Sequence, residues 1–218
     1  MNMDKKKLLM IGGGGVLVLL AIVAFIVISK PSVIVDPVAV LKEAAMGIPK
    51  EEDRLGVQGA LVEFEKSGAL ADYFATSYGC VVFPTIGKGG FGVGGAHGAG
   101  WVFKKGQLTG ISKMTQLTIG FQAGGQAFSQ IIFFENETSY TQFTGGNFEF
   151  GAQASAVALT VGANAAASTA GGASAGAGGA QAKSSYTNGM AVFTLAKGGL
   201  MYEASLGGQK FSFSTKLD

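Results

Sequence analysis

The residues best suited to chemistry lie in a glycine-rich stretch at residues 79 to 103, GCVVFPTIGKGGFGVGGAHGAGWVF. Lys88 precedes Gly89 and Gly90, so its ammonium group and exposed backbone N–H groups could hold a phosphate. Glycine also falls at every second position from Gly90 to Gly94, which on a strand leaves one face without side chains. A bare face favours close approach, whether of a neighbouring backbone, of a tightly coiled sheet or of a ligand's head group.

A nucleotide site is a weaker interpretation of the same stretch. Gly90, Gly92 and Gly95 match the pattern G-x-G-x-x-G, but a dinucleotide-binding fold needs a helix that starts at the third glycine. The residues that follow, as far as Trp101, have the pattern of another strand. The downstream V-A-I-K and H-R-D sequences of a protein kinase are absent. We therefore expect no nucleotide cofactor, and the sequence indicates no other cofactor.

Catalytic and metal-binding groups are scarce. His97 is the only histidine, which argues against a metal site with several histidine ligands. It is interpreted as a turn or sheet-edge residue bonded to backbone, or as a polar contact at the mouth of the glycine-rich surface. Cys80, the only cysteine, lies in the apolar run CVVF and is predicted to be a buried, inert thiol. No third group that would orient Cys80 and His97 as a catalytic pair can be named. The sequence therefore favours a non-enzymatic protein.

The charge distribution argues against nucleic acid as a partner. Removing the four lysines and one aspartate of residues 1–30 from the 16 basic and 14 acidic residues leaves 12 and 13, a net charge of −1. A nucleic-acid-binding domain would be strongly basic. The two halves differ, because residues 31–79 hold four basic and eight acidic residues and residues 80–218 hold eight and five. The glycine-rich half is thus the more positive one.

The N-terminus has the pattern of a membrane anchor. Leu8 to Ser29 carries no charge over 22 residues, about the length of a transmembrane helix, and Lys5 to Lys7 precede it. By the positive-inside rule these lysines remain in the cytoplasm, which places the rest of the chain on the other side of the membrane. A cleaved signal peptide is the alternative, although no small-x-small cleavage site follows the run. We expect an anchor or signal peptide at 1–30, a linker at 31–35 and one domain at 36–218.

The first part of that domain has helical patterns. Asp36-Pro37 is typical of an N-cap followed by proline at the first helical position, and predicts a helix to about Met46. A second helix is expected over 53–66 and a third over 69–77, with Leu70 and Phe74 facing inward. The apolar face of the second helix comprises Val57, Ala60, Leu61 and Phe64.

After Gly79 the pattern changes to strands. We predict a mainly antiparallel sheet, strongly twisted or barrel-like, which gives an α+β fold with the helices first. Hairpin turns are expected at 104–107, 135–138 and 206–209. An Ala/Gly/Ser tract at 163–185 lacks large apolar side chains and is interpreted as a long mobile loop. The predicted strands are 81–83, 91–95, 100–104, 108–114, 118–122, 130–135, 148–159, 186–195, 200–205 and 210–214.

Four blocks of the sequence resemble a known family. They are GCVVFPTIGKGGFGVGGAHGAGWVF, LTIGFQAGGQAFSQIIFFEN, FEFGAQASAVAL and AVFTLAKGGLMYEASLGGQKF, and they occur in the family's order. Over residues 40 to 215 the chain is similar to the SYLF-domain lipid-binding family, in a bacterial form. The resemblance implies a non-enzymatic domain that binds membranes, with phosphoinositide binding and actin-patch roles in eukaryotic members.

The resemblance also implies a basic lipid-contacting surface. Lys88 is the safest position for it, and Lys104, Lys105 and Lys113 are further candidates. With Gly89, Gly90 and His97 they make up the predicted lipid-binding residues. The family's amphipathic lipid-binding helix would fall near 53–66, but this segment is acidic here, and no lipid role is assigned to its residues.

Two functional hypotheses remain open. The first is a domain tethered to the bacterial cytoplasmic membrane on its extracytoplasmic side, which binds anionic phospholipid head groups. The second is a scaffold that binds envelope proteins through a sheet edge, with the glycine face serving only tight packing. Binding that falls with salt and with Lys88→Ala would favour the first hypothesis. The lipid and the oligomeric state are not indicated by the sequence.

Overall fold

The computed structural model describes residues 35–150, 157–159, 186–198 and 208–217. The chain divides into two units, Met1–Val35 and Asp36–Asp218, and all the described helices and strands belong to the second. The predicted membrane anchor at 8–29, the loop at 163–185 and the strand at 200–205 lie outside the described residues. Within the described part, no helix is both long enough and apolar enough to cross a bilayer.

The second unit begins with the predicted capped helix. Helix α2 spans Pro37–Ala44 and continues into a short 3-10 helix, η1, at Ala45–Gly47. The Asp36 carboxylate accepts a hydrogen bond from the Val38 N–H at 2.9 Å, which satisfies one of the free donors of the first turn. Pro37 occupies the first turn, where its missing N–H costs nothing. The predicted start of this helix is confirmed.

Two further helices follow, also as predicted. Helix α3 spans Glu51–Glu65 and α4 spans Ala71–Thr76. All four predicted apolar residues of α3 are buried, as are Leu70 and Phe74. The Phe74 ring meets that of Phe133 edge-on, with centroids 5.1 Å apart, so α4 is fixed against the sheet.

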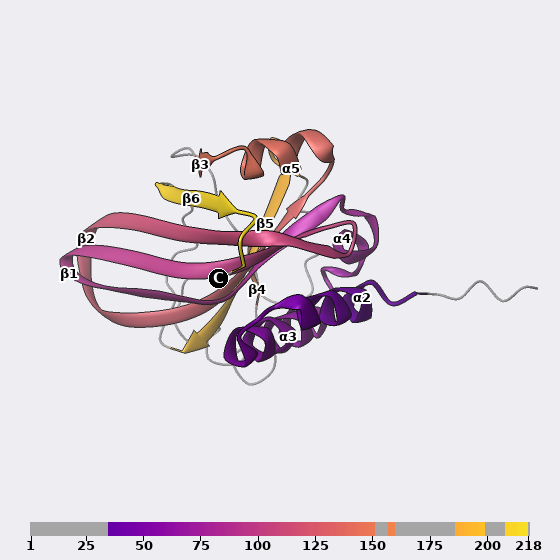
Figure 1. The fold of residues 1–218 in the computed structure, drawn as a ribbon. Coiled ribbons are helices and arrows are strands. Elements are labelled where there is room, and N and C mark those ends of the chain that lie inside the picture. Colours follow the sequence, from indigo (N-terminus) through magenta and orange to yellow (C-terminus); the bar gives the residue numbers. More distant parts are fainter. Residues whose placement is uncertain (1–34, 151–156, 160–185, 199–207, 218) are drawn as a thin grey trace, which may run out of the picture. The chain divides into compact units, whose positions relative to one another are not determined.

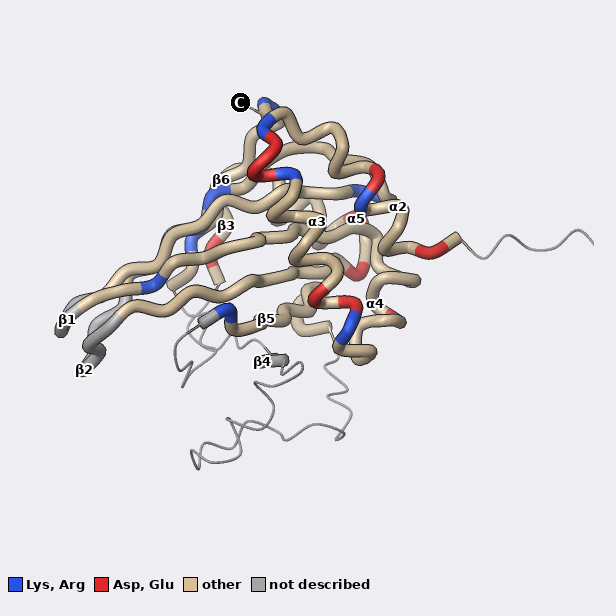
Figure 2. The backbone as a smooth tube through the Cα atoms, turned by 90° about the horizontal axis from the view of Figure 1, so that it is seen from below, with Lys and Arg blue, Asp and Glu red and all other residues tan. Residues whose placement is uncertain are grey.

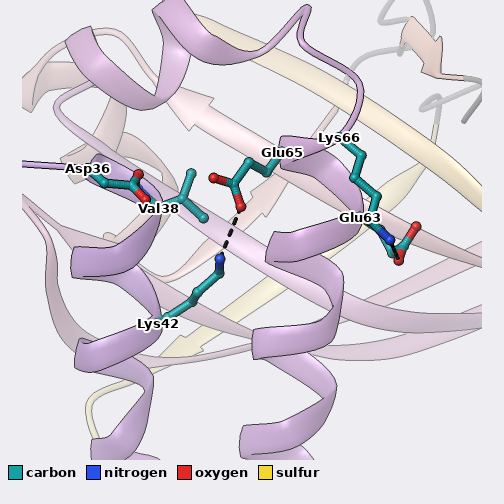
Figure 3. A network of polar contacts seen from close by, with 6 residues as sticks. All are labelled: Asp36, Val38, Lys42, Glu63, Glu65 and Lys66. Atoms are coloured by element: carbon teal, nitrogen blue, oxygen red, sulfur yellow. Dashed lines mark hydrogen bonds and ion pairs between the residues drawn. The ribbon is translucent and has the colours of Figure 1, made fainter.

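Polar contacts join α2 to α3 at the surface (Figure 3). Lys42 Nζ lies 3.0 Å from Glu65 Oε2, and a second pair within the end of α3 joins Lys66 to Glu63 at 2.7 Å. Gln58 Nε2 donates to the Lys42 carbonyl at 3.1 Å. Because these ion pairs are partly exposed, each contributes at most about 1 kcal/mol, and burial of the apolar helix faces dominates the packing.

One long hairpin forms the centre of the sheet (Figure 1). Strands β1, Gly79–Lys104, and β2, Gln107–Phe134, pair antiparallel along their lengths, and the turn between them has positive φ angles at Lys105 and Gly106. The turn predicted at 104–107 is confirmed. The separate short strands predicted on either side of it are wrong, because they merge. Glycine was taken as a strand break, whereas here glycines pair with one another across the ladder, as Gly89 does with Gly125.

The remaining strands add to the free edge of β2. Strand β6, Gln209–Ser214, pairs with residues 111–116 of β2, and β5, Met190–Gly198, pairs with residues 127–134. Strand β3, Asn147–Glu149, pairs antiparallel with β6, and β4, Val157–Leu159, pairs parallel with β5. The order is β3-β6-β2-β5-β4, with β1 on the other side of β2. The mainly antiparallel α+β class is confirmed, and among the described strands this order is open, not closed as in the barrel-like form.

Two glycines allow the halves of β1 to lie against each other. A Cβ atom on Gly100 would sit 2.6 Å from the Phe83 ring, and one on Gly98 would sit 2.7 Å from Ile86 Cγ1. Real Cβ atoms do not approach so closely, so both positions require a bare backbone. Close approach thus occurs at Gly98 and Gly100, by packing within the strand. The bare face expected at Gly90, Gly92 and Gly94 stays a prediction.

The buried side chains form two clusters. One lies between helices α2 to α4 and the sheet and includes Val57, Phe64 and Phe133. The other includes Phe83, Phe134 and residues of helix α5, Glu137–Thr144. The sheet is thus covered by side chains from helices on one side and by aromatic residues around α5 on the other.

Helix α5 replaces a predicted turn. The sequence ENET at 135–138 was assigned to a hairpin turn, but Asn136 caps a helix instead. Its Oδ1 accepts from the Ser139 N–H at 3.1 Å, and Ser139 Oγ accepts from the Asn136 N–H at 3.3 Å. This reciprocal capping box, together with burial of Tyr140 and Phe143, favours a helix over a turn.

The strand predicted at 186–195 begins later than expected, at Met190. It follows a turn with positive φ at Asn188 and Gly189.

Candidate functional site

A shallow pocket lies where β1, β2 and the end of β5 meet. Its volume is about 510 Å³, it is open to solvent, and it is lined by Gly87, Lys88, Gly125, Gln126, Ala127 and Lys197. Two of these six residues are lysines and none is acidic. We call it the two-lysine pocket. Two cations and no anion among the lining residues favour an anionic ligand.

The register of the sheet explains why the pocket is hollow. Gly87 pairs with Ala127, Lys88 with Gln126 and Ala127 with Gly198, so small residues from three strands lie side by side. A Cβ atom on Gly87 would have no atom within 4 Å, and one on Gly125 would meet only the Lys88 carbonyl oxygen at 3.8 Å. Packing therefore does not require glycine at these two positions, in contrast to Gly98 and Gly100.

A hydrogen bond fixes the second lysine. Lys197 Nζ donates to Thr85 Oγ1 at 2.9 Å, which joins the end of β5 to β1. Thr85 and Lys197 are both exposed, whereas Lys88 is half-buried. The two lysines thus come from strands far apart in the sequence, and both are among the residues that line the hollow.

The structure places Gly89 and Gly90 beside the pocket, in the ladder. They pair with Gly125 and Gly124 of β2. The glycines whose backbone N–H groups were suggested for a phosphate are therefore part of the β1–β2 ladder. What remains of the prediction is the combination of Lys88 with a glycine-lined surface.

His97 and Lys113 lie on another part of the sheet. His97 pairs with Thr115, and Lys113 pairs with Ala99 on one side and Ser212 on the other. Both side chains are exposed, and neither lines the two-lysine pocket. Figure 2 shows the basic positions of the described residues in several separate places along the backbone. Neither His97 nor Lys113 therefore shares the pocket with Lys88.

Lys104 and Lys105 belong to an aromatic cluster at the hairpin turn. Lys104 Nζ lies 3.4 Å from Glu137 Oε1 and 5.4 Å from the centroids of both Tyr78 and Tyr140. Lys105 Nζ lies 5.0 Å from the Tyr78 centroid. Hydrogen bonding to the Tyr78 side chain, with a smaller effect of Glu137, raises the pKa of Lys104, and the same tyrosine and Lys104 lower the pKa of Glu137. Lys104 thus joins the hairpin to α5 through Glu137 and Tyr140, and Lys105 adds a contact with the Tyr78 ring.

Cys80, the remaining candidate for a reactive side chain, is buried. Cys80 is 2% exposed, and burial raises the pKa of its thiol to about 12. A thiol of this kind is protonated at neutral pH and does not act as a nucleophile. His97 lies exposed on the sheet, so it is not buried with the cysteine. Among the described residues, no group of three or more His, Cys, Asp or Glu side chains could hold a metal ion.

A comparison with protein families identifies the second half of the chain. The family model Ysc84, described as "Las17-binding protein actin regulator", matches residues 115–218. Residues 115–218 match the Ysc84 family, the SYLF-domain family. The predicted resemblance is confirmed over these residues. No curated protein matches the chain.

The Ysc84 match includes most of β2, β5 and β6. Four residues of the two-lysine pocket, from Gly125 to Ala127 and Lys197, fall inside it, while Gly87 and Lys88 precede it. Members of this family act as binding domains for lipid or protein and are not known as enzymes. The general role of this domain is accordingly binding.

Sequence reasoning singled out Lys88 of the pocket and missed Lys197. The block AKGG at 196–199 contributed to the family resemblance, yet Lys197 was not assigned to the site. The missing information was the pairing of Ala127 with Gly198, which brings the end of β5 to the glycine-rich part of the hairpin. A lysine followed by two glycines in both KGG segments, at 88–90 and 197–199, was the one signal available in the sequence.

Proposed function

We propose that this domain binds anionic phospholipid head groups at the two-lysine pocket, while the apolar segment at 8–29 holds it at the bacterial cytoplasmic membrane on the extracytoplasmic side. The observation that carries the proposal is the pocket itself. Lys88 and Lys197 line a solvent-open hollow whose lining has no acidic residue and includes two glycines and an alanine. The family match supports a binding role in general.

The energetics suit a tethered domain. A lysine close to an anionic membrane surface contributes about 1 kcal/mol, so two lysines alone would bind a free domain weakly. A membrane anchor raises the effective concentration of lipid near the pocket, and weak contacts then become significant. Such contacts are electrostatic and weaken as added salt shortens the screening length.

A protein partner is the second candidate. The family description names binding of the protein Las17 by a family member, and this favours a protein-binding role as the alternative. In this chain, β3 and β4 end the strand order, and each has one edge without a strand partner among the described residues. An envelope protein could add a strand at such an edge.

The test compares vesicles of different charge. The full chain is held in phosphatidylcholine nanodiscs, and its binding to immobilised vesicles of phosphatidylcholine, with or without phosphatidylglycerol, is measured at low and high salt. We expect binding that requires phosphatidylglycerol, falls with salt and falls further in Lys88→Ala. The matched control is Lys216→Ala, which removes an exposed lysine outside the pocket lining. Equal binding to both kinds of vesicle would contradict the proposal, and no binding to either would favour a protein partner.

A further inference from the structure

We propose that the two-lysine pocket is a discrete site for one phosphate group, and that Thr85 is the positioning residue for Lys197 in that site. The phosphate could belong to a phospholipid head group or to a soluble phosphate ester, since both present the same anionic oxygens. The lipid form of this inference rests on the function proposed above, and the soluble form does not.

The charges of the lining favour phosphate. A phosphate group offers several oxygens around one centre, so two ammonium groups from different strands can each donate to it. Lys88 comes from β1 and Lys197 from β5, and no carboxylate among the lining residues competes for either. A cation would find no ligand of opposite charge in this lining.

The floor of the pocket favours a compact group that comes close to the backbone. Gly87 and Gly125 have no Cβ, and the structure leaves space above both. Neither glycine has a positive φ angle, so a side chain at either position would be accommodated by the strand. The open space can therefore be filled by mutation without strain, which provides a way to block the site while both lysines remain.

Thr85 determines where the second ammonium lies. Its Oγ1 accepts from Lys197 Nζ at 2.9 Å, which restricts the rotamers of a long and otherwise exposed side chain. A lysine held in place loses less conformational freedom when it binds a ligand. Because Thr85 is exposed, replacing it should not disturb the core. Thr85→Ser keeps the hydroxyl, and Thr85→Val removes it with little change of shape.

The experiment titrates the full chain, in neutral detergent micelles, with inorganic phosphate and with dihexanoylphosphatidylglycerol, using acetate as the control anion. Amide chemical shifts of Gly87 and Gly125 are the readout. We expect saturable, one-to-one shifts with both phosphate compounds and none with acetate. Loss of one charged hydrogen-bond donor should weaken binding about tenfold or more in Lys88→Ala and in Lys197→Ala. Gly87→Val should abolish the shifts at Gly125 with both lysines present.

The variants of Thr85 test the positioning role separately. Thr85→Val should weaken phosphate binding several-fold, and Thr85→Ser should restore it. Lys216→Ala, which removes one exposed lysine outside the pocket lining, should bind as the parent chain does. Shifts that persist in the double variant Lys88→Ala/Lys197→Ala, or that acetate reproduces, would overturn the site.

The two proposals fail in different ways. If inorganic phosphate binds in the pocket but charged vesicles are not captured, the phosphate site stands for a soluble ester and the membrane proposal falls. If charged vesicles are captured in a way that depends on Lys88, but neither phosphate compound gives saturable shifts, the membrane proposal stands and the single-phosphate site falls.

Discussion

Lys197 Nζ donates a hydrogen bond to Thr85 Oγ1 at 2.9 Å, across a separation of 112 residues in the sequence. The contact joins the end of β5 to β1, the strand that also carries Lys88. Two lysines that are far apart in the chain, Lys88 and Lys197, thereby line one hollow. The proposed binding site depends on the presence of both lysines in this pocket.

The glycines of the hairpin should divide into two classes. Gly100→Ala should lower the free energy of unfolding by about 1–3 kcal/mol, because its Cβ would lie 2.6 Å from the Phe83 ring. Gly87→Ala should be neutral or stabilise by up to about 1 kcal/mol, because its Cβ would enter open space. Urea denaturation of the two variants measures the difference. Equal effects would contradict the described path of β1.

The buried thiol predicts a pH dependence. Burial raises the pKa of Cys80 to about 12, whereas a thiol in the unfolded chain has a pKa of about 8.5. The folded state therefore retains this proton above the pH at which the unfolded state loses it. The contribution of the thiol to stability is complete below about pH 8.5 and falls by up to about 1.4 kcal/mol per pH unit above it.

The Cys80→Ala variant isolates this effect. It should be less stable than the parent at neutral pH, since a buried side chain is truncated. Its stability should nevertheless fall less steeply between pH 9 and 11 than that of the parent. Parallel pH profiles for the two proteins would show that the thiol is accessible to solvent. A thiol reagent that labels the native protein rapidly would show the same.

Lys104 should act mainly in stability. Its ammonium contacts Glu137 and the rings of Tyr78 and Tyr140, so Lys104→Ala should lower the unfolding midpoint. Because the Lys104 ammonium already contacts Glu137 and two tyrosine rings, Lys104→Ala should reduce binding to charged vesicles less than Lys88→Ala does. A double-mutant cycle with Glu137→Ala should show that the two losses of stability do not add. A larger loss of vesicle binding in Lys104→Ala than in Lys88→Ala would contradict this assignment.

A buried glutamine network should hold β6 against β2. Gln130 Nε2 donates to Gln209 Oε1 at 3.1 Å, and Gln209 Nε2 approaches Gln130 Oε1 at 3.4 Å. Gln209→Leu should cost about 1–3 kcal/mol, because it leaves the Gln130 amide buried without that partner. Gln130→Leu/Gln209→Leu should recover part of the loss, since both polar groups are then removed. Thermal unfolding of the variants measures the recovery, and a double variant no more stable than Gln209→Leu would contradict the prediction.

The local features of the fold were predictable where one segment carries its own signal. Asp36-Pro37 identified a helix start, and the spacing of Val57, Ala60, Leu61 and Phe64 identified a buried helix face. The turn at Lys105 and Gly106 was also found. Each of these depends on contacts between residues close in sequence.

Two of the errors came from elements whose partners are distant, and one came from a local helix cap. Glycines at 89 and 90 looked like strand breaks, because their pairing with Gly125 and Gly124 cannot be seen in one strand alone. Asn136 was assigned to a turn, although its capping partner Ser139 was visible in the sequence. Lys197 was missed because only the pairing of β5 with β2 brings it to Lys88. The site is thus assembled by register, which residue patterns do not determine.

The most direct test of the account compares two double variants of equal charge. Lys88→Ala/Lys197→Ala removes both cations of the pocket, and Lys50→Ala/Lys216→Ala removes two exposed lysines that do not line it. Capture of phosphatidylglycerol-containing vesicles by the full chain, held in phosphatidylcholine nanodiscs, is measured for both at low salt. The account predicts that the first variant loses most of its binding and the second retains it. Equal losses in the two variants would mean that only net charge matters, and would contradict a binding site at the two-lysine pocket.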